Sequence, residues 1–431
     1  MPRFVARIVL VLAALILLRG IYSEIRTWKG YEEESDFPVY YTAAWLVRTD
    51  LNVHLYDEAE LNIDPIHGDA DPGSVFFQTA HAHGIPDVSR YIYPPTLADL
   101  MVPLTFLPHR AALIAWHILN LAMVAATAIL LARMLGLLLP GQIALVGALL
   151  FLFRPTLCCF YYGQAPVLLL FLSIAGFHFY RRGSPRWAGF FFALAIAIKL
   201  TPLVVVLPFL AWRQWKMLRA IALWCLVLLA ALWAVNGTAA LALYAGHVVP
   251  SMMYRNIDMT NINLGTALQV FWYGSDRGSP IAGLVLLSKI LSVLVLAAAA
   301  WLSRSRRAES LSLDHQLTIL AVFLMISCCI SPVSWLHAYT LSAPAMLIAF
   351  LRVHRGQSSL PESFLALWFL FVNASTKLIN WAWTTHRTPL YDLAIFTPIV
   401  GILLGFVLLA RLRAQHSAAR ERTPQTASAT A

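Results

Sequence analysis

Three titratable side chains lie within or beside long apolar segments, where such groups are uncommon. Asp36 follows the acidic run at residues 32–34, just beyond the first long apolar stretch. A carboxylate at such a boundary between membrane and water can stay ionised and can act as a general base. Lys199 lies inside an apolar run, where an ammonium costs roughly 3 kcal/mol on insertion scales. It therefore needs an anionic partner or an aqueous pocket. His337 stands in a turn between two later apolar runs.

Together these groups fit a substrate that carries a phosphate on a lipid. The phosphate of a polyprenol must lie at the membrane interface, with its chain among the helices. Lys199, together with a protonated His337 or Arg255, would hold that phosphate and stabilise it as a leaving group. Asp36 would take the proton from an incoming hydroxyl. One base and one displaced phosphate predict a single displacement with inversion at the sugar carbon, and we expect neither a metal nor another cofactor.

The composition predicts a polytopic membrane protein. Hydrophobic residues make up 60% of the 431 residues and charged residues only 12%, whereas soluble domains are nearer half apolar and a quarter charged. Lipid must therefore cover much of the apolar surface. The net charge of +10 would suggest nucleic acid in a soluble protein. Here the arginines lie in short loops between apolar runs, which is typical of membrane topology, so no nucleic-acid partner is expected.

The apolar runs predict an all-α bundle of about twelve transmembrane helices. The first run, residues 4–18, indicates an uncleaved anchor with its N-terminus in the cytoplasm. The polar stretch of about residues 19–93 holds most of the acids and predicts a large first extracytoplasmic loop. The remaining runs are Ala111–Leu131, Gln142–Cys158, Val167–Tyr180, Ala188–Ile198, Leu203–Ala211, Leu218–Val235, Ile281–Leu302, Leu317–Ile330, Leu336–Leu351, Phe364–Asn380 and Ile395–Leu412.

Two features fix the expected topology. The segment Lys199–Pro202 should divide residues 188–211 into two short helices, since proline interrupts helical hydrogen bonding. Such a break must lie in a protein-lined cavity. With this hairpin, every loop rich in arginine or lysine falls on the inner side. Residues 1–413 are then a single transmembrane domain, and residues 414–431 are a disordered cytoplasmic tail.

The expected outer turns are rich in polar and aromatic residues, and they supply the candidates for substrate binding. These candidates are Tyr40, Tyr41, Tyr93, Gln164, Lys199, Asn261, Asn263, Trp335 and His337. Simpler interpretations remain for several of them. Tyrosines and tryptophans at this depth commonly form an interfacial belt, a lysine can snorkel to the interface, and Asp36 can be an ordinary solvated carboxylate.

Six short motifs occur in one order along the chain. They are Asp36-Phe37 with Tyr40-Tyr41-Thr42-Ala43-Ala44, Leu55-Tyr56-Asp57, Tyr93-Pro94-Pro95, Gly163-Gln164, Lys199-Leu200-Thr201-Pro202, and Ser331-Pro332-Val333-Ser334-Trp335-Leu336-His337. This order resembles glycosyltransferase family 87, which includes polyprenol-phosphate-mannose-dependent α-mannosyltransferases. The resemblance implies a GT-C type helical bundle, a catalytic aspartate at Asp36 in the first outer loop, and metal-independent transfer.

The resemblance has two departures. The family often has two consecutive histidines after the Ser-Trp pair, whereas His337 is followed by Ala338. An outer loop that often reads Asn-Gln-Ser is here Asn261-Ile262-Asn263. These departures bear on the acceptor and on the donor sugar. Mannose is taken as the default donor sugar, and the acceptor is a lipid or a glycan.

The expected protein is a glycosyltransferase of the cell membrane whose active site faces the extracytoplasmic side. Its partners are a polyprenyl-phosphate sugar donor, the acceptor and membrane lipid. A polytopic transporter or flippase of a lipid-linked or small polar substrate is the alternative, and a non-catalytic membrane scaffold is a third hypothesis. Transporter sites usually lie near the midplane and often within sequence repeats. The sequence shows no repeat, and its polar motifs gather on one expected face.

Overall fold

The computed structural model describes residues 36–56, 70–254, 261–273, 281–305, 311–356, 363–369, 372 and 397–421. Regular secondary structure within these ranges is helical. The predicted anchor at residues 4–18, the acidic run, Arg255, Asp57 and the end of the predicted tail lie outside the described residues. Most of the predicted run at residues 364–380 also lies outside them.

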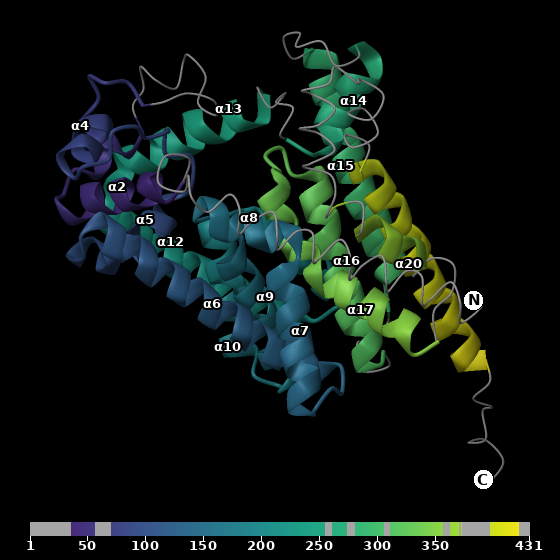
Figure 1. Cartoon of the computed structure of the whole chain (residues 1–431). Coiled ribbons are helices and arrows are strands. Elements are labelled where there is room, and N and C mark those ends of the chain that lie inside the picture. Colours follow the sequence, from purple (N-terminus) through teal and green to yellow (C-terminus); the bar gives the residue numbers. More distant parts are fainter. Residues whose placement is uncertain are drawn as a thin grey trace, which may run out of the picture.

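The segment before the first long helix folds into a small group of short helices. These are α2 (Phe37–Arg48), η2 (Asn52–Leu55), α4 (Val75–Ala82), α5 (Pro95–Met101) and η3 (Val102–Phe106). Helix α2 packs against α4, α5 and η3, and nearly all of its side chains are buried. The group lies together at the upper left of Figure 1. This arrangement holds Asp36, the residue before α2, against the rest of the bundle.

The central helices follow the predicted apolar runs. They are α6 (His109–Met134), α7 (Pro140–Leu152), α8 (Arg154–Tyr162), α9 (Pro166–Arg181), α10 (Pro185–Ile198), η4 (Thr201–Val205), α11 (Val206–Ala211) and α12 (Trp215–Leu243). Helices α7 to α10 each have a proline in their first turn, where the missing N–H costs no helical hydrogen bond.

The break at Lys199 is present, as the sequence predicted. Helix α10 ends at Ile198, and Lys199 has extended backbone angles of φ −155° and ψ 135°. Pro202 then lies in the first turn of η4. The predicted single run Gln142–Cys158 is wrong in detail, because the structure divides it into α7 and α8, which are bent by 63°.

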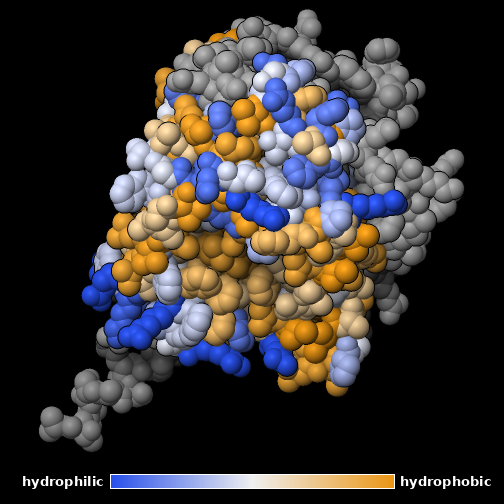
Figure 2. Space-filling view, turned by 90° about the vertical axis from the view of Figure 1, so that its left-hand side faces the viewer, coloured by the Kyte–Doolittle hydropathy of each residue, from blue (hydrophilic) through white to orange (hydrophobic). Residues whose placement is uncertain are grey.

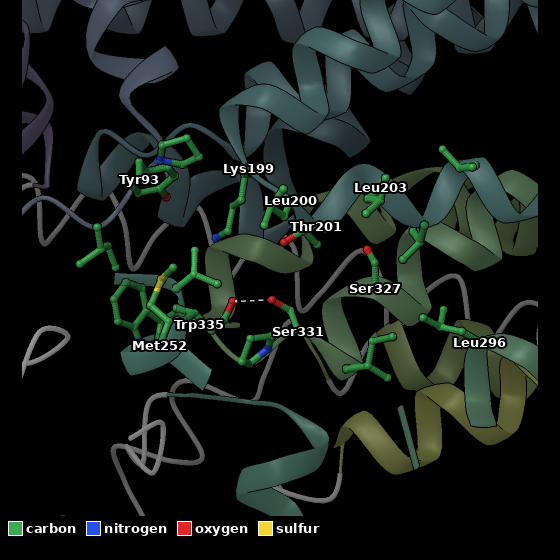
Figure 3. Close-up of a pocket in the computed structure, with 18 of the residues that line it drawn as sticks. Tyr93, Lys199, Leu200, Thr201, Leu203, Met252, Leu296, Ser327, Ser331 and Trp335 are labelled. Atoms are coloured by element: carbon green, nitrogen blue, oxygen red, sulfur yellow. Dashed lines mark hydrogen bonds between the residues drawn. The ribbon is translucent and has the colours of Figure 1, made fainter. Parts of the chain in front are cut away.

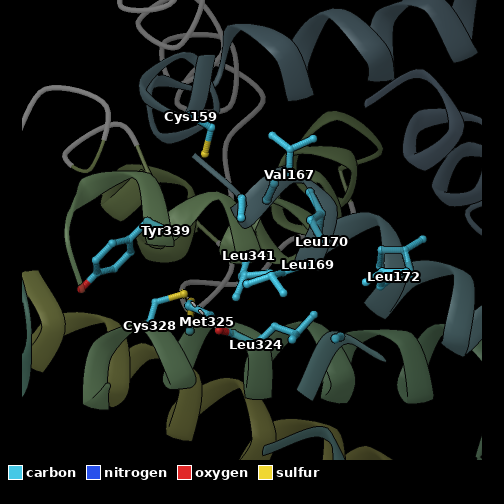
Figure 4. Packing of buried hydrophobic residues seen from close by; sticks show 14 of the residues in the cluster. Cys159, Val167, Leu169, Leu170, Leu172, Leu324, Met325, Cys328, Tyr339 and Leu341 are labelled. Atoms are coloured by element: carbon cyan, nitrogen blue, oxygen red, sulfur yellow. Dashed lines mark hydrogen bonds between the residues drawn. The ribbon is translucent and has the colours of Figure 1, made fainter. Parts of the chain in front are cut away.

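The last part of the chain contains a long helix that is largely buried. The elements are η5 (Tyr244–Val248), α13 (Val249–Tyr254), α14 (Leu264–Tyr273), α15 (Ala282–Ser303), α16 (Leu313–Ile330), η7 (Leu336–Ser342), α17 (Ala343–His354) and α20 (Thr397–Glu421). Helix α16 is buried along most of its length. Figure 4 shows its Leu324, Met325 and Cys328 facing side chains of α9 and η7.

The outer helices present apolar side chains to the surroundings. Exposed leucines and valines occur along α12 and α15, for example Leu226 and Val293. Figure 2 shows hydrophobic residues across the middle of one face, with hydrophilic residues gathered toward its lower edge and its upper part. Such a surface is expected where lipid replaces water as the solvent.

The described part of the chain holds six helices that are long and apolar enough to cross a membrane, or up to seven if the bent pair α7–α8 is one span. The six are His109–Met134, Trp215–Met252, Ala282–Ser303, Leu313–Ile330, Leu336–His354 and Thr397–Ala414. Helices α9, α10 and η4–α11 are apolar but shorter. The protein is therefore a multi-pass membrane protein, and its regular secondary structure is helical throughout the described residues.

Candidate active site

Asp36 is fixed at both its backbone and its side chain by the turn that follows α8. The Asp36 N–H donates to the Tyr162 carbonyl at 2.8 Å, and Gln164 Nε2 donates to Asp36 Oδ2. Burial raises the pKa of Asp36 to about 6, and the hydrogen bond from Gln164 opposes that rise. A carboxylate with this pKa is ionised at neutral pH and lies close to the range in which a general base works best.

Gln164 also joins Asp36 to two tyrosines. The hydroxyls of Tyr40 and Tyr93 donate to Gln164 Oε1 at 2.7 Å and 2.9 Å. Their rings meet edge to face with centroids 5.2 Å apart. Gly163 has a φ of +66°, in the left-handed region that favours glycine, and its carbonyl accepts from Trp116 Nε1 at 2.8 Å. This turn places the Gln164 side chain against Asp36.

A cavity of about 550 Å³ lies on the other side of Tyr93. Its polar lining includes Lys199, Thr201, Ser327 and Ser331, and most of its remaining lining is apolar. Figure 3 shows the Lys199 side chain extending into the space between Tyr93 and Trp335. The Lys199 Nζ lies 5.4 Å from the centre of the Tyr93 ring.

Lys199 forms no ion pair and no hydrogen bond with any residue that the structure describes. A cation is stabilised over an aromatic face, but that contact does not neutralise it. An ammonium enclosed by apolar walls favours an anionic partner. The cavity therefore has the electrostatic character of a site for a negatively charged group.

His337 stands between the cavity wall and the Asp36 turn. Its ring centroid is 5.6 Å from that of Trp335 and 6.5 Å from that of Tyr162. The side chain is only 4% exposed, and within the described ranges its Nε2 has no hydrogen-bond partner. A buried imidazole nitrogen in this position can form a hydrogen bond with a bound substrate, which makes His337 a candidate for substrate contact.

Three of the predicted binding residues hold the fold together instead of facing the cavity. The Tyr41 hydroxyl donates to the Leu107 carbonyl at 2.8 Å. Asn261 and Asn263 both donate to the Pro332 carbonyl, at 2.8 Å and 2.7 Å. The side-chain Oδ1 of Asn261 also accepts from the Ser334 N–H at 2.7 Å. The two asparagines thus fasten their loop to the turn before η7.

The structure therefore connects seven of the ten predicted site residues. Asp36, Tyr40, Tyr93 and Gln164 share hydrogen bonds, while Lys199, Trp335 and His337 join them through ring contacts.

Two further residues near this cluster were not predicted from the sequence. Tyr244 lines the cavity and lies 5.7 Å from the Tyr56 ring. Asp99 accepts from Asn236 Nδ2 at 3.0 Å and 3.1 Å, and burial raises its pKa to about 6. The predicted apolar run ended at Val235, so the continuation of α12 to Leu243, directly before Tyr244, gave no sequence signal. Asp99 lies in a short, proline-flanked segment without a recognisable motif.

Comparisons with known proteins agree on one family. The polyprenol-phosphate-mannose-dependent alpha-(1-2)-phosphatidylinositol pentamannoside mannosyltransferase of Mycolicibacterium smegmatis is 28% identical over 315 residues, which are 70% of this chain and 72% of that protein. The polyprenol-phosphate-mannose-dependent alpha-(1-2)-phosphatidylinositol mannoside mannosyltransferase of Mycobacterium tuberculosis is 27% identical over 407 residues, which are 88% of this chain and 89% of that protein.

The family model covers the central part of the chain. Glycosyltransferase family 87 matches residues 91–332, which is more than half of the sequence. The matched segment contains Tyr93, Gln164 and Lys199, whereas Asp36 and His337 lie outside it. The chain belongs to glycosyltransferase family 87 and is a membrane glycosyltransferase.

Proposed function

We propose that this enzyme transfers a sugar, mannose by default, from a polyprenyl-phosphate donor to an acceptor hydroxyl on the extracytoplasmic side of the membrane. The observation that carries the proposal is the Lys199 ammonium. It lines an apolar cavity without an anionic partner in the described structure, and Tyr93 connects it to the residue that holds Asp36.

The cavity suits both parts of a lipid-linked donor. The phosphate would lie near Lys199, with Thr201 and His337 as neighbouring hydrogen-bonding groups. The polyprenyl chain would follow the apolar lining supplied by η4, α11 and α15, including Leu203, Leu207 and Leu296. The side chains of Leu200 and Leu203 are about half exposed, which supports an opening of the cavity toward lipid.

Asp36 would act as the general base. Lys199 would stabilise the developing charge on the departing phosphate, while Asp36 takes the proton of the acceptor hydroxyl. The hydroxyl oxygen forms the new bond to the sugar carbon as the bond to the phosphate oxygen breaks. One displacement inverts the configuration at that carbon. Tyr40, Tyr93, Gln164 and Trp335 would complete the surroundings of the sugar and the base.

The names of the relatives suggest the donor and the kind of acceptor. Both are polyprenol-phosphate-mannose-dependent enzymes that act on phosphatidylinositol mannosides. We propose the same donor class here and a lipid-linked acceptor that presents a sugar hydroxyl. The full chain would be a GT-C type bundle with about twelve passes, residues 1–413 forming one domain and residues 19–93 its large outer loop.

An assay of purified enzyme tests this proposal. The protein would be incubated with a panel of radiolabelled polyprenyl-phosphate sugars and with phosphatidylinositol mannosides as acceptors. Transfer of label to the acceptor with release of polyprenyl phosphate is expected, together with an inverted linkage by NMR. Movement of the donor lipid across vesicle membranes without any transfer would instead support the flippase alternative.

A further inference from the structure

The side-chain amide of Gln164 contacts hydrogen-bond donors at its oxygen and an acceptor at its nitrogen. Its oxygen accepts two hydroxyl hydrogens, from Tyr40 at 2.7 Å and from Tyr93 at 2.9 Å. Its nitrogen donates to Asp36 Oδ2. The partners come from two segments that are distant from Gln164 in the sequence, since Asp36 and Tyr40 are 128 and 124 residues away and Tyr93 is 71 residues away. The arrangement is thus built by the tertiary fold and not by local sequence.

This arrangement favours one orientation of the amide. If the amide were reversed, its oxygen would face the ionised Asp36 carboxylate, and two acceptors would meet without a proton between them. The two tyrosine hydroxyls fill both lone pairs of the oxygen in the observed orientation. Burial raises the pKa of both tyrosines, so they remain donors throughout the physiological range.

The same bonds select which carboxylate oxygen is left for the reaction. Gln164 occupies Oδ2, while Oδ1 has no hydrogen-bond partner in the part of the chain that the structure describes. We propose that Gln164 is a positioning residue for the transfer reaction and that Tyr40 and Tyr93 act as a redundant pair that fixes its amide, so that Asp36 Oδ1 faces the acceptor hydroxyl. This inference rests on the proposed role of Asp36 as the base.

Redundancy makes a sharp prediction for the two tyrosines. Tyr40→Phe or Tyr93→Phe removes one hydroxyl and keeps the edge-to-face ring contact, so the remaining tyrosine still fixes the amide. Each single variant should lose only about threefold in kcat. The double variant removes both donors and leaves the amide free to reverse. Its loss should exceed the product of the single losses by about tenfold or more, because residues that share one partner are not additive.

Tyr91→Phe is the matched control for this cycle. Tyr91 is also buried in the same segment, and its hydroxyl donates to the Pro94 carbonyl at 2.8 Å without contacting Gln164. The double variant of Tyr40→Phe and Tyr91→Phe should show the simple product of its single effects. We expect kcat to fall by more than the product of the single effects in the Tyr40–Tyr93 pair, and by no more than that product in this control.

A pH profile separates positioning from general damage to the fold. Gln164→Leu removes the donor to the charged carboxylate, so protonation of Asp36 should become easier. The acidic limb of the kcat profile should then move to higher pH by at least about half a unit. Gln164→Glu keeps the size and both tyrosine partners but places a second carboxylate beside Asp36. It should move the limb in the same direction, even if Gln164→Leu folds poorly.

The other titratable groups around Asp36 are the same in every protein of this comparison. They are Tyr40 from α2, Tyr93 from the segment before α5, Tyr162 from α8 and, beyond these rings, Lys199 and His337. All five are unchanged between the wild type and the Gln164 variants, so a displaced limb belongs to the altered amide.

The outcomes distinguish this inference from the proposed function. If Asp36→Asn keeps the wild-type rate, Asp36 is not the base, and the proposed positioning role of Gln164 fails with it. A second outcome separates the two proposals. If Asp36→Asn is inactive, but the effects of Tyr40→Phe and Tyr93→Phe simply multiply and the acidic limb of the kcat profile does not move in Gln164→Glu, Asp36 remains the base. The positioning role of Gln164 is then overturned.

Discussion

The Lys199 ammonium lies 5.4 Å from the centre of the Tyr93 ring. The hydroxyl of the same tyrosine donates to Gln164 Oε1, and Gln164 holds Asp36. A single aromatic side chain thus separates Lys199 from the network of the proposed base. This spacing suits a substrate whose phosphate lies beside Lys199 and whose reacting carbon lies nearer to Asp36.

Lys199→Ala should weaken use of the donor more than Lys199→Arg does. Hydrogen bonds to charged groups contribute about 1.5–3 kcal/mol, and each 1.4 kcal/mol corresponds to a factor of ten. The alanine variant should therefore raise the KM for the polyprenyl-phosphate donor by about tenfold or more. Arginine keeps the charge but has a different shape, so its effect should be smaller.

Steady-state kinetics over a range of donor concentrations measures this difference. Unchanged KM and kcat in Lys199→Ala would make the residue a snorkelling lysine and would place the phosphate elsewhere.

Asp36→Asn should abolish most of the transfer activity. The change keeps the size of the side chain and removes proton acceptance, and loss of a general base typically costs on the order of 10²–10⁴ in rate. In the wild type, kcat/KM should fall as the pH drops through about 6, since the pKa of Asp36 is raised to about 6 and only the ionised form accepts a proton.

Asp99→Asn is the control for that pH profile. The pKa of Asp99 is also raised to about 6 by burial, so the position of the limb alone does not assign it to either carboxylate. Asp99 contacts Asn236 and lies outside the cavity lining. The Asp99→Asn variant should keep the acidic limb. Loss of the limb in this variant, with full activity of Asp36→Asn, would transfer the base assignment to Asp99.

Asn261 and Asn263 should prove to be structural residues. Asn261→Ala leaves the buried Ser334 N–H without its acceptor, which costs about 1–3 kcal/mol. Asn263 Oδ1 accepts from the Thr266 N–H at 2.8 Å and caps α14. Asn263→Ala removes this cap together with the donor to the Pro332 carbonyl, so it should also lose stability.

Thermal unfolding of the purified variants in detergent measures these losses. Normal melting temperatures combined with a raised KM for the acceptor would restore the two asparagines to the binding site.

The sequence was sufficient for the elements that depend on local composition. Long apolar runs predicted α6, α15 and α16 close to their observed bounds, because a spanning helix satisfies its own backbone and needs only apolar side chains. The break at Lys199–Pro202 was also predictable from proline chemistry. The bend between α7 and α8 carried a similar signal at Pro155, since a proline interrupts the hydrogen bonds of a continuous helix.

The partners of the site residues were not predictable. The types and places of Tyr40 and Gln164 suggested substrate contact, but their bond to each other joins residues 124 positions apart. In the same way, the polar side chains of Asn261 and Asn263 suggested binding, whereas the Pro332 carbonyl that they contact lies 71 and 69 residues away. Such pairings follow from tertiary packing and leave no periodic pattern in the sequence.

The topology gives the last prediction. Gln78 on α4 should be extracytoplasmic, and Arg182, Arg219 and Gly356 should be cytoplasmic; all four positions are exposed in the structure. The expectation follows from the distribution of arginine and lysine and requires α10 and η4–α11 to return the chain to the inner side. Single cysteines at these positions, in a chain whose native cysteines are replaced by alanine, would be treated with a membrane-impermeant maleimide in intact cells and again after permeabilisation.

Only the cysteine at Gln78 should react before permeabilisation, and all four should react afterwards. The comparison between Arg182 and Arg219 decides the most important step, because these two positions flank the broken hairpin at Lys199. If both are protected, the chain returns at the break, and Lys199 lies in the hairpin on the outer side together with Asp36. If position 219 reacts in intact cells while position 182 does not, α10 and α11 form one crossing. Every later helix would then be reversed, and His337 would be carried to the cytoplasmic side, away from the proposed site of transfer.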